Sequence, residues 1–304
     1  ANHLLTVKGV IDMEPDPALA AIKTYRYLRI ALTALVLLLF TSIALEWWGA
    51  DRCVQPSISA YYFTPVQAVF IGVLVTMGAS LLALKGNTDG EDVLMNLAGM
   101  LAPGVAFIPT VASGVCGSGA AGDGIADAVA NNMPALFVTG VAVGIAALVI
   151  ARRENRARRT NPDTTTGDES LSPQSRRGLV LAVAVLGGGV VWFFADRDSF
   201  IARGHDAAAI PMFLAIIAVV WLNARDVRRA VQQGSMPQDR SRYVAMYRVV
   251  AVSMLAALLA TVGLSLLTGS TSLVFWVEVV LLILFAVFWV IQAVELWDRG
   301  LRRP

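Results

Sequence analysis

The stretch LVFWVEVVLLILFAVFWVIQAVEL, residues 273–296, is apolar along its whole length except at Glu278, Gln292 and Glu295. A helix needs roughly 20 mainly apolar residues to cross the ~30 Å hydrocarbon core of a bilayer. The stretch is long enough for that, and it predicts a transmembrane helix. Glu278 is the one acidic residue that lies well inside a predicted span.

The apolar character extends over the whole chain. Of its 304 residues, 57% are hydrophobic and 15% are charged, and the mean hydropathy is +0.66. These values are far more apolar than a soluble domain of this length needs. We therefore predict an all-α fold, a polytopic transmembrane helical bundle with eight spans. The spans are placed at residues 28–48, 65–84, 93–112, 134–151, 178–195, 208–225, 247–268 and 273–296.

The basic residues give an independent test of the span count, because cytoplasmic loops of membrane proteins retain Lys and Arg. With the N-terminus inside, eight spans leave only Arg52, Arg197 and Arg203 of the 24 basic residues outside. An odd number of spans would distribute the Arg-rich segments over both sides. We therefore predict an even number of spans in the cell (inner or plasma) membrane, with both termini cytoplasmic.

Four segments are predicted along the chain. They are a cytoplasmic N-terminal arm (1–27), a first four-span half (28–151), a cytoplasmic Arg-rich flexible linker (152–177) and a second four-span half (178–304). The halves share one short match, WWGADR at 47–52 and WFFADR at 192–197, each followed by a proline that opens the next span. The match suggests a weak parallel repeat, although interfacial Trp followed by polar residues also recurs by chance.

The outside loops contain more Asp than Arg, and this acidic balance excludes nucleic acid as a partner on that face. The basic inner loops attract anionic lipid headgroups or merely determine the topology. The expected partners are membrane lipids, together with other membrane-protein subunits or a second copy of the chain. The only two histidines, His3 and His205, are predicted on opposite sides, and no nucleotide-binding loop or nucleophile elbow occurs. We expect no metal and no cofactor.

Cys53 and Cys116 are the only cysteines, and they fall in the first and second predicted outside loops. A disulfide persists only on that side of the membrane. We predict a Cys53–Cys116 bridge, the alternative being two unrelated small residues at the membrane interface.

The stretch SISAYYFTP, residues 57–65, places many hydroxyl groups just before the second span. Thr64 and Pro65 are typical of a helix start, and two tyrosines suit the membrane interface. Ser57 and Ser59 remain, and with Arg52 they suggest an outward-facing site for an anionic or polyol headgroup. The alternative is a capped loop that folds over the mouth of the bundle.

A carboxylate inside a span is costly unless it is paired, protonated or facing water, so Glu278 marks a candidate site. Its expected partner lies on the outer half of another span or in a loop, with Glu46 and Arg52 among the candidates. The alternative is a carboxyl satisfied by neighbouring helices that serves assembly alone. The predicted ligand-binding residues are Glu278, Glu46, Arg52, Ser57, Ser59, Tyr61 and Tyr62; no catalytic residue is predicted.

The stretches QPSISAYYFTP and LKGNTDGEDVLMNLAGMLAPGVAFIPT resemble a group of uncharacterised multispanning membrane proteins of high-GC, actinobacterial-type bacteria. The resemblance covers roughly residues 55–110. It implies a bacterial inner-membrane origin and no particular activity.

Three functions are consistent with these features. The first is a non-enzymatic binder or transporter of a small molecule or lipid headgroup, with an outward-facing polar vestibule. The second is an accessory or scaffold subunit of a larger membrane complex. The third is an interfacial membrane hydrolase, which the missing catalytic motifs disfavour.

Overall fold

The computed structural model describes residues 17–110, 122–160, 173–268 and 272–302. Those residues form eight α-helices and no strand. The helices are α1 (Pro17–Gly49), α2 (Gln67–Ala83), α3 (Asp89–Phe107), α4 (Gly122–Thr160), α5 (Pro173–Ala195), α6 (Arg197–Gln232), α7 (Arg242–Thr268) and α8 (Ser272–Glu295). Two 3₁₀ turns, η1 (Ser59–Phe63) and η3 (Gln238–Ser241), lie between them.

Each predicted span coincides with a helix, and six of the helices are long and apolar enough to cross a membrane. The six are α1, α4, α5, α6, α7 and α8. Helix α2 is apolar but shorter, at 17 residues. Helix α3 has three acidic residues in its first turn, which shorten its apolar run.

Successive helices run in opposite directions. At one end, the loop before α2 meets the start of α8, and the residue after α3 meets the first part of α6. At the other end, the first part of α1 meets the residues after α8. We call these the loop end, which carries η1, and the terminal end, which carries Pro17 and Arg302.

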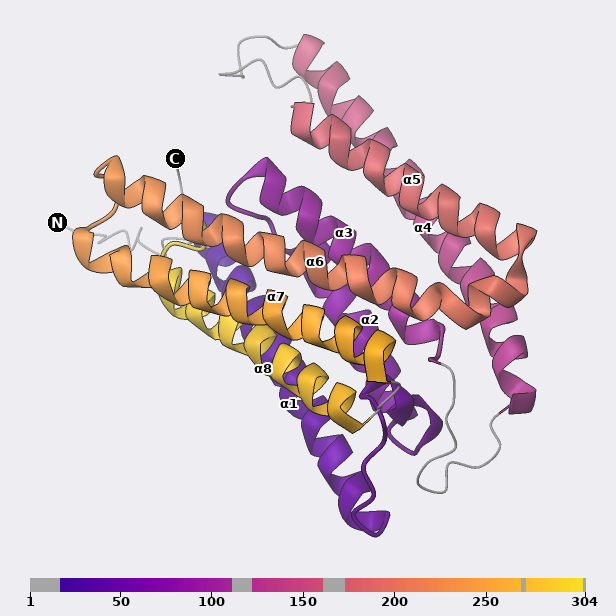
Figure 1. The fold of residues 1–304 in the computed structure, drawn as a ribbon. Helices are drawn as coiled ribbons and strands as arrows, with labels where there is room; N and C mark the ends of the chain where they lie inside the picture. The colour runs from indigo at the N-terminus through magenta and orange to yellow at the C-terminus, as the bar shows by residue number, and fades with distance from the viewer. Residues whose placement is uncertain (1–16, 111–121, 161–172, 269–271, 303–304) are drawn as a thin grey trace, which may run out of the picture.

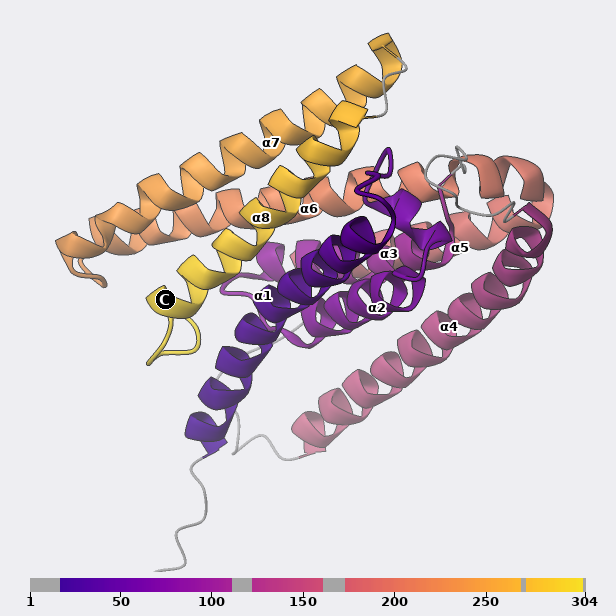
Figure 2. The same cartoon turned by 90° about the horizontal axis from the view of Figure 1, so that it is seen from below.

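Six helices form the compact part of the bundle. Helix α3 packs between α2 and α6, α7 packs on α6 and α8, and α8 packs on α1. The α4–α5 hairpin lies along one side, against α3 and α6 (Figures 1 and 2). Only 11% of the apolar window of α4 and 6% of that of α5 are buried within the chain. Most residues of these two windows are therefore not buried by the chain itself and are left for contact with lipid or a partner.

Two glycines allow a close contact between α2 and α3. A Cβ atom added to Gly78 on α2 would lie 2.7 Å from the carbonyl oxygen of Gly99 on α3, and one added to Gly99 would lie 2.8 Å from that of Gly78. Such distances exclude any side chain. The pair fixes α2 against α3, and this contact positions the loops at both ends of the two helices.

The helices extend beyond several predicted boundaries. Helix α1 begins within the predicted N-terminal arm, and α4 continues through the Arg-rich segment to Thr160, so residues 152–160 are helical and not a flexible linker. Helix α3 ends at Phe107, short of the predicted 112. Helix α6 begins at Arg197, where Asp196 accepts a hydrogen bond from the Ser199 amide at 3.0 Å. Helix α6 therefore begins about three turns before the predicted sixth span.

The two matching segments share a local arrangement. Arg52 lies 5.5 Å from the ring centre of Trp48, and Arg197 lies 5.6 Å from that of Phe193, so each arginine stacks near an aromatic ring four residues earlier. The prolines differ, because Pro65 precedes α2 whereas Pro211 lies inside α6. The parallel repeat stays a prediction.

Candidate functional site

A cavity of about 370 Å³ opens among α1, α2, α3, α6, α7 and α8 at the loop end. Its polar wall comes from the segment before η1, from the residue after α3, and from the loop-end parts of α6, α7 and α8. Its apolar wall comes mainly from α2, α6 and α8. The polar side chains that line it are Ser57, Ser59, Thr110, His205, Asp206, Thr261 and Glu278.

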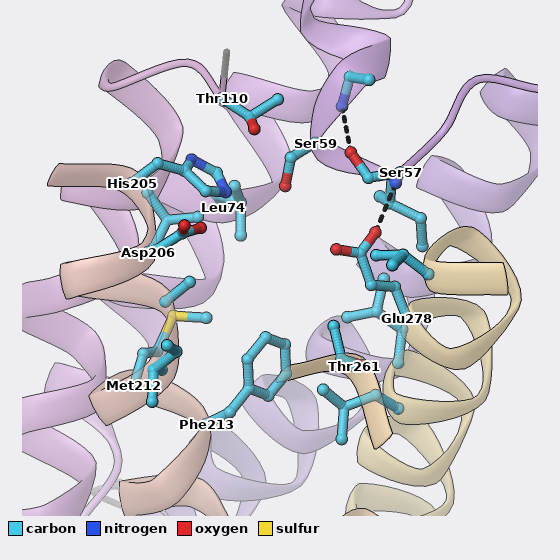
Figure 3. A pocket seen from close by; sticks show the side chains of 18 of the residues that line it. Ser57, Ser59, Leu74, Thr110, His205, Asp206, Met212, Phe213, Thr261 and Glu278 are labelled. Carbon is cyan, nitrogen blue, oxygen red and sulfur yellow. Dashed lines mark hydrogen bonds between the residues drawn. The ribbon is translucent and has the colours of Figure 1, made fainter. Parts of the chain in front are cut away.

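Glu278 is held by the backbone of the η1 loop. The amide of Ile58 donates a hydrogen bond to Glu278 Oε2 at 2.6 Å. Ser57 fixes the loop, because its hydroxyl accepts a hydrogen bond from the Ala60 amide at 3.0 Å. Figure 3 shows both bonds. The side-chain partners predicted for Glu278, Glu46 and Arg52 among them, do not contact it, and a backbone donor takes their place.

The second carboxylate oxygen of Glu278 accepts no hydrogen bond from the described residues and faces the cavity (Figure 3). Across the cavity, the Asp206 side chain extends from α6 toward it. Asp206 is exposed, whereas Glu278 is half-buried. The cavity therefore presents two carboxylates from opposite walls, and one of them has an unused acceptor.

Four of the seven predicted site residues do not line the cavity. Tyr61 and Tyr62 are buried beneath the loop, where Tyr61 packs on Phe275 with ring centres 6.0 Å apart. Burial raises the pKa of both tyrosines, so both hydroxyls stay neutral. Their role in the structure is to support the loop. Ser57, Ser59 and Glu278 are the predicted residues that the cavity brings together.

Arg52 and Glu46 also lie away from the cavity. The Arg52 guanidinium is exposed and lies 5.7 Å and 5.5 Å from the rings of Trp47 and Trp48. Stacking on the end of α1 directs it away from the carboxylates. Glu46 is half-buried on the last turns of α1. Arg52 therefore does not line the cavity, and a role for it in ligand binding stays a prediction.

The sequence reasoning missed His205 and Asp206 as site residues. His205 is buried, and its Nδ1 lies 2.8 Å from the carbonyl oxygen of Ile108. This bond ties α6 to the end of α3. In the described part of the chain, no Ser or Thr hydroxyl is hydrogen-bonded to His205.

A second polar cluster, also missed, lies buried at the terminal end. Glu91 on α3 is 1% exposed, Asn223 on α6 is 0% exposed and Gln292 on α8 is 2% exposed. Glu91 Oε1 accepts from Asn223 at 2.8 Å and from Gln292 at 3.5 Å, and Gln292 also donates to Asn223 at 3.1 Å. Glu91 Oε2 accepts from the backbone and side chain of Asn87 at 2.8 and 3.0 Å. Arg29 joins α1 to the cluster by donating to Gln292 at 2.9 Å.

Glu295 forms the other half of this cluster. Arg302 donates to both of its oxygens at 2.7 and 2.5 Å, and the Tyr247 hydroxyl donates at 2.5 Å. Burial alone would lower the pKa of Arg302, but the hydrogen bonds to Glu295 and its charge raise it. Gly300, at φ +69°, turns the chain so that its carbonyl accepts from Arg29 at 2.7 Å. We call the residues Arg29, Asn87, Glu91, Asn223, Tyr247, Gln292, Glu295 and Arg302 the terminal cluster.

Neither region is arranged as a metal site. Within the described residues, no three His, Cys, Asp or Glu side chains are grouped to hold an ion. Cys116 lies outside the described residues, so its bridge to Cys53 stays a prediction.

Comparison of the chain with models of protein families, with curated proteins and with solved structures finds no match. The resemblance at residues 55–110 therefore stays a prediction. Those residues contribute to both polar regions, because they include Ser57 and Ser59 of the cavity and Glu91 of the terminal cluster.

Proposed function

We propose that the chain is an integral protein of the bacterial plasma membrane whose eight helices all span the bilayer. The alternating helix directions support this proposal, as does the position of α2 and α3 inside the bundle. At ~1.5 Å per residue, the 17 residues of α2 reach about 26 Å, near the lower limit for a spanning helix.

The charge distribution supports cytoplasmic termini. The terminal end carries the Arg-rich end of α4, the start of α5, and the arginines near η3 and after α8. The loop end carries only Arg52, Arg197 and Arg203 among the described residues. The positive-inside rule then places the terminal end in the cytoplasm and the cavity on the outer side.

We further propose that the cavity binds a small amphiphilic molecule or lipid headgroup, for binding or transport across the membrane. The observation that carries this proposal is the unused Glu278 oxygen in a cavity of about 370 Å³. A carboxylate in a membrane protein is normally satisfied by protein, water or a ligand. The volume lies in the range of small-molecule sites. The buried terminal cluster lies at the opposite end of the bundle, which favours access to the cavity from the outer side.

Filling the cavity tests the proposal. Ala209 lines the cavity, so Ala209→Trp should remove any amphiphile that co-purifies with the protein, as measured by native mass spectrometry. Ala202→Trp is the matched control, because Ala202 is exposed on the same helix and does not line the cavity. Thr261→Phe fills the cavity from α7 and provides a second test.

Two results would contradict the proposed function. One is that the wild-type protein binds no amphiphile. The other is that Ala209→Trp and Thr261→Phe retain the same molecule as Ala202→Trp, because the binding site would then lie elsewhere.

The α4–α5 hairpin favours a second candidate, a scaffold or accessory subunit. Large apolar side chains are exposed along it, among them Val138 at 69% and Val180 at 68%. Lipid covers such a surface in a protein that acts alone, and a partner covers it in a complex. Cross-linking from Val138→Cys in native membranes distinguishes these cases, since a scaffold gives one discrete cross-linked protein and a lipid-exposed helix gives none.

A further inference from the structure

The polar wall of the loop-end cavity is acidic. Glu278 and Asp206 face each other across it, and none of the described residues that line it is Lys or Arg. Arg52, the nearest predicted cation, stacks on Trp47 and Trp48. His205 is held by the Ile108 carbonyl. The polar part of any occupant must therefore supply positive charge or hydrogen-bond donors.

The rest of the cavity is apolar. Met77 of α2, Phe213 of α6 and Leu281 of α8 line it, and Figure 3 shows Phe213 on the side of the two carboxylates away from Ser59 and Thr110. An occupant that fills both parts needs a cationic head and an apolar chain. A hydrated metal ion fits poorly, because a hard cation takes six or more oxygen ligands and no three acidic, His or Cys side chains are grouped among the described residues.

The type of cation can be narrowed further. Quaternary ammonium groups donate no hydrogen bonds and are recognised by cages of aromatic rings. Among the described residues, the aromatic side chains that line the cavity are Phe70 and Phe213, apart from the His205 ring. A primary ammonium donates three hydrogen bonds. It matches the unused Glu278 oxygen and the Asp206 carboxylate, with the Ser59 and Thr110 hydroxyls as further acceptors.

We propose that the ligand is a single-chain amphiphile with a primary amine head. Its ammonium group lies between Glu278 and Asp206, and its chain follows the apolar wall toward Phe213 and Leu281. The proposal rests on the proposed function of the cavity and assigns the chemical class of its ligand.

The test uses the full-length protein in lipid nanodiscs with dodecylamine, dodecyltrimethylammonium, dodecanol and dodecanoic acid as probes. These share one chain length and differ in the head. Binding is measured by displacement of radiolabelled dodecylamine. Dodecylamine should compete at least tenfold better than each other probe, because only its head is both cationic and a hydrogen-bond donor.

Variants at the carboxylates locate the head. Glu278→Gln should weaken dodecylamine binding at least tenfold, and Asp206→Asn at least threefold, with the weaker effect at the exposed position. Asp198→Asn is the matched control, because Asp198 is exposed on the same helix as Asp206 and does not line the cavity. It should bind dodecylamine as the wild type does.

The failure of this inference differs from the failure of the proposed function. Suppose that dodecanol or dodecanoic acid binds as tightly as dodecylamine, and that Ala209→Trp removes that binding. The cavity then binds amphiphiles, but the assignment of a primary amine head is wrong. Dodecylamine binding that survives both Glu278→Gln and Asp206→Asn also overturns the amine head. If no probe binds, or if Ala209→Trp leaves all binding intact, the proposed function itself fails.

Discussion

The two polar regions of this bundle contain the same kinds of residue in opposite states. In the terminal cluster, Glu91 and Glu295 are 1% and 4% exposed, and all four of their carboxylate oxygens accept hydrogen bonds from the chain. In the loop-end cavity, Glu278 accepts one hydrogen bond and leaves one oxygen facing open space.

The two regions differ in whether their carboxylates are fully hydrogen-bonded, and not in residue type. This difference distinguishes a structural carboxylate from one that is available to a ligand. A buried charge whose partners all belong to the protein stabilises a single arrangement, and removal of one partner is costly. A charge with an unused acceptor in a cavity has room for a partner from outside. The terminal cluster links α1, α3, α6, α7 and α8, whereas the cavity leaves space between such helices.

The largest expected effect comes from breaking the terminal cluster. Arg302→Met should lower the free energy of unfolding by about 3–5 kcal/mol, because it leaves the buried Glu295 carboxylate without its positive partner. Unfolding by dodecyl sulfate in mixed micelles measures this. Arg299→Met, an exposed arginine in the same segment, should change stability by less than about 0.5 kcal/mol. Equal effects of the two substitutions would show that the cluster is not what holds the terminal end together.

The predicted disulfide should stabilise the loop end, as the terminal cluster stabilises the opposite end. If Cys53 and Cys116 are bonded, alkylation without reductant modifies neither, and intact mass measurement detects this. Cys116→Ser should then cost about 2–4 kcal/mol of stability. Labelling of both cysteines in non-reduced protein would show that the bridge does not form.

Within the terminal cluster, the neutral partners should contribute less. Asn223→Leu removes the donor to Glu91 and the acceptor for Gln292, and it should cost about 1–2 kcal/mol. Asn96→Leu on α3 is the control, because Asn96 is exposed. A loss no greater than that of the control would mean that the amide bonds add nothing to the carboxylate contacts.

The smallest effect on stability is expected at the cavity. Glu278→Gln should cost under about 1 kcal/mol, because the amide oxygen still accepts from Ile58 and no other described residue depends on the side chain. Glu91→Gln should cost more, about 1–3 kcal/mol, since both carboxylate oxygens accept from the chain and an amide nitrogen cannot. If Glu278→Gln cost more stability than Glu91→Gln, Glu278 would have a structural role. That result would favour the scaffold function.

Hydropathy was sufficient to locate the eight helices but not their ends. The predicted spans overlap every helix, because apolar length is a property of the local sequence. Helix ends depend on caps and on contacts outside the apolar window. Asp196 starts α6 eleven residues before the predicted 208, and that extension brings His205 and Asp206 into the bundle.

The site was predictable only in part, for a similar reason. Glu278 is conspicuous as an acid within an apolar run, and Ser57 and Ser59 as hydroxyls at a span entrance. The direction in which a side chain points depends on tertiary packing, so the sequence could not show that Arg52 lies near the rings of Trp47 and Trp48 and does not line the cavity.

The terminal cluster was missed because its members read as ordinary residues at helix ends. Glu91 follows the N-cap Thr88 by three residues, as in a capping box, and Thr88 accepts from the Glu91 amide at 3.3 Å. Gln292 and Glu295 lie near the end of the last span, where polar residues are common. Only the packing of α8 against α1 and of α6 against α3 brings them together.

Thiol labelling of intact cells tests whether the cavity is accessible from outside the cell. With a membrane-impermeant maleimide, a cysteine at Ser59 should react in intact cells, and dodecylamine should slow the reaction. A cysteine at Ser235, exposed at the terminal end, should react only after permeabilisation. Labelling of Ser235→Cys in intact cells, with Ser59→Cys unreactive until the cells are permeabilised, would show that the cavity is not accessible from outside the cell.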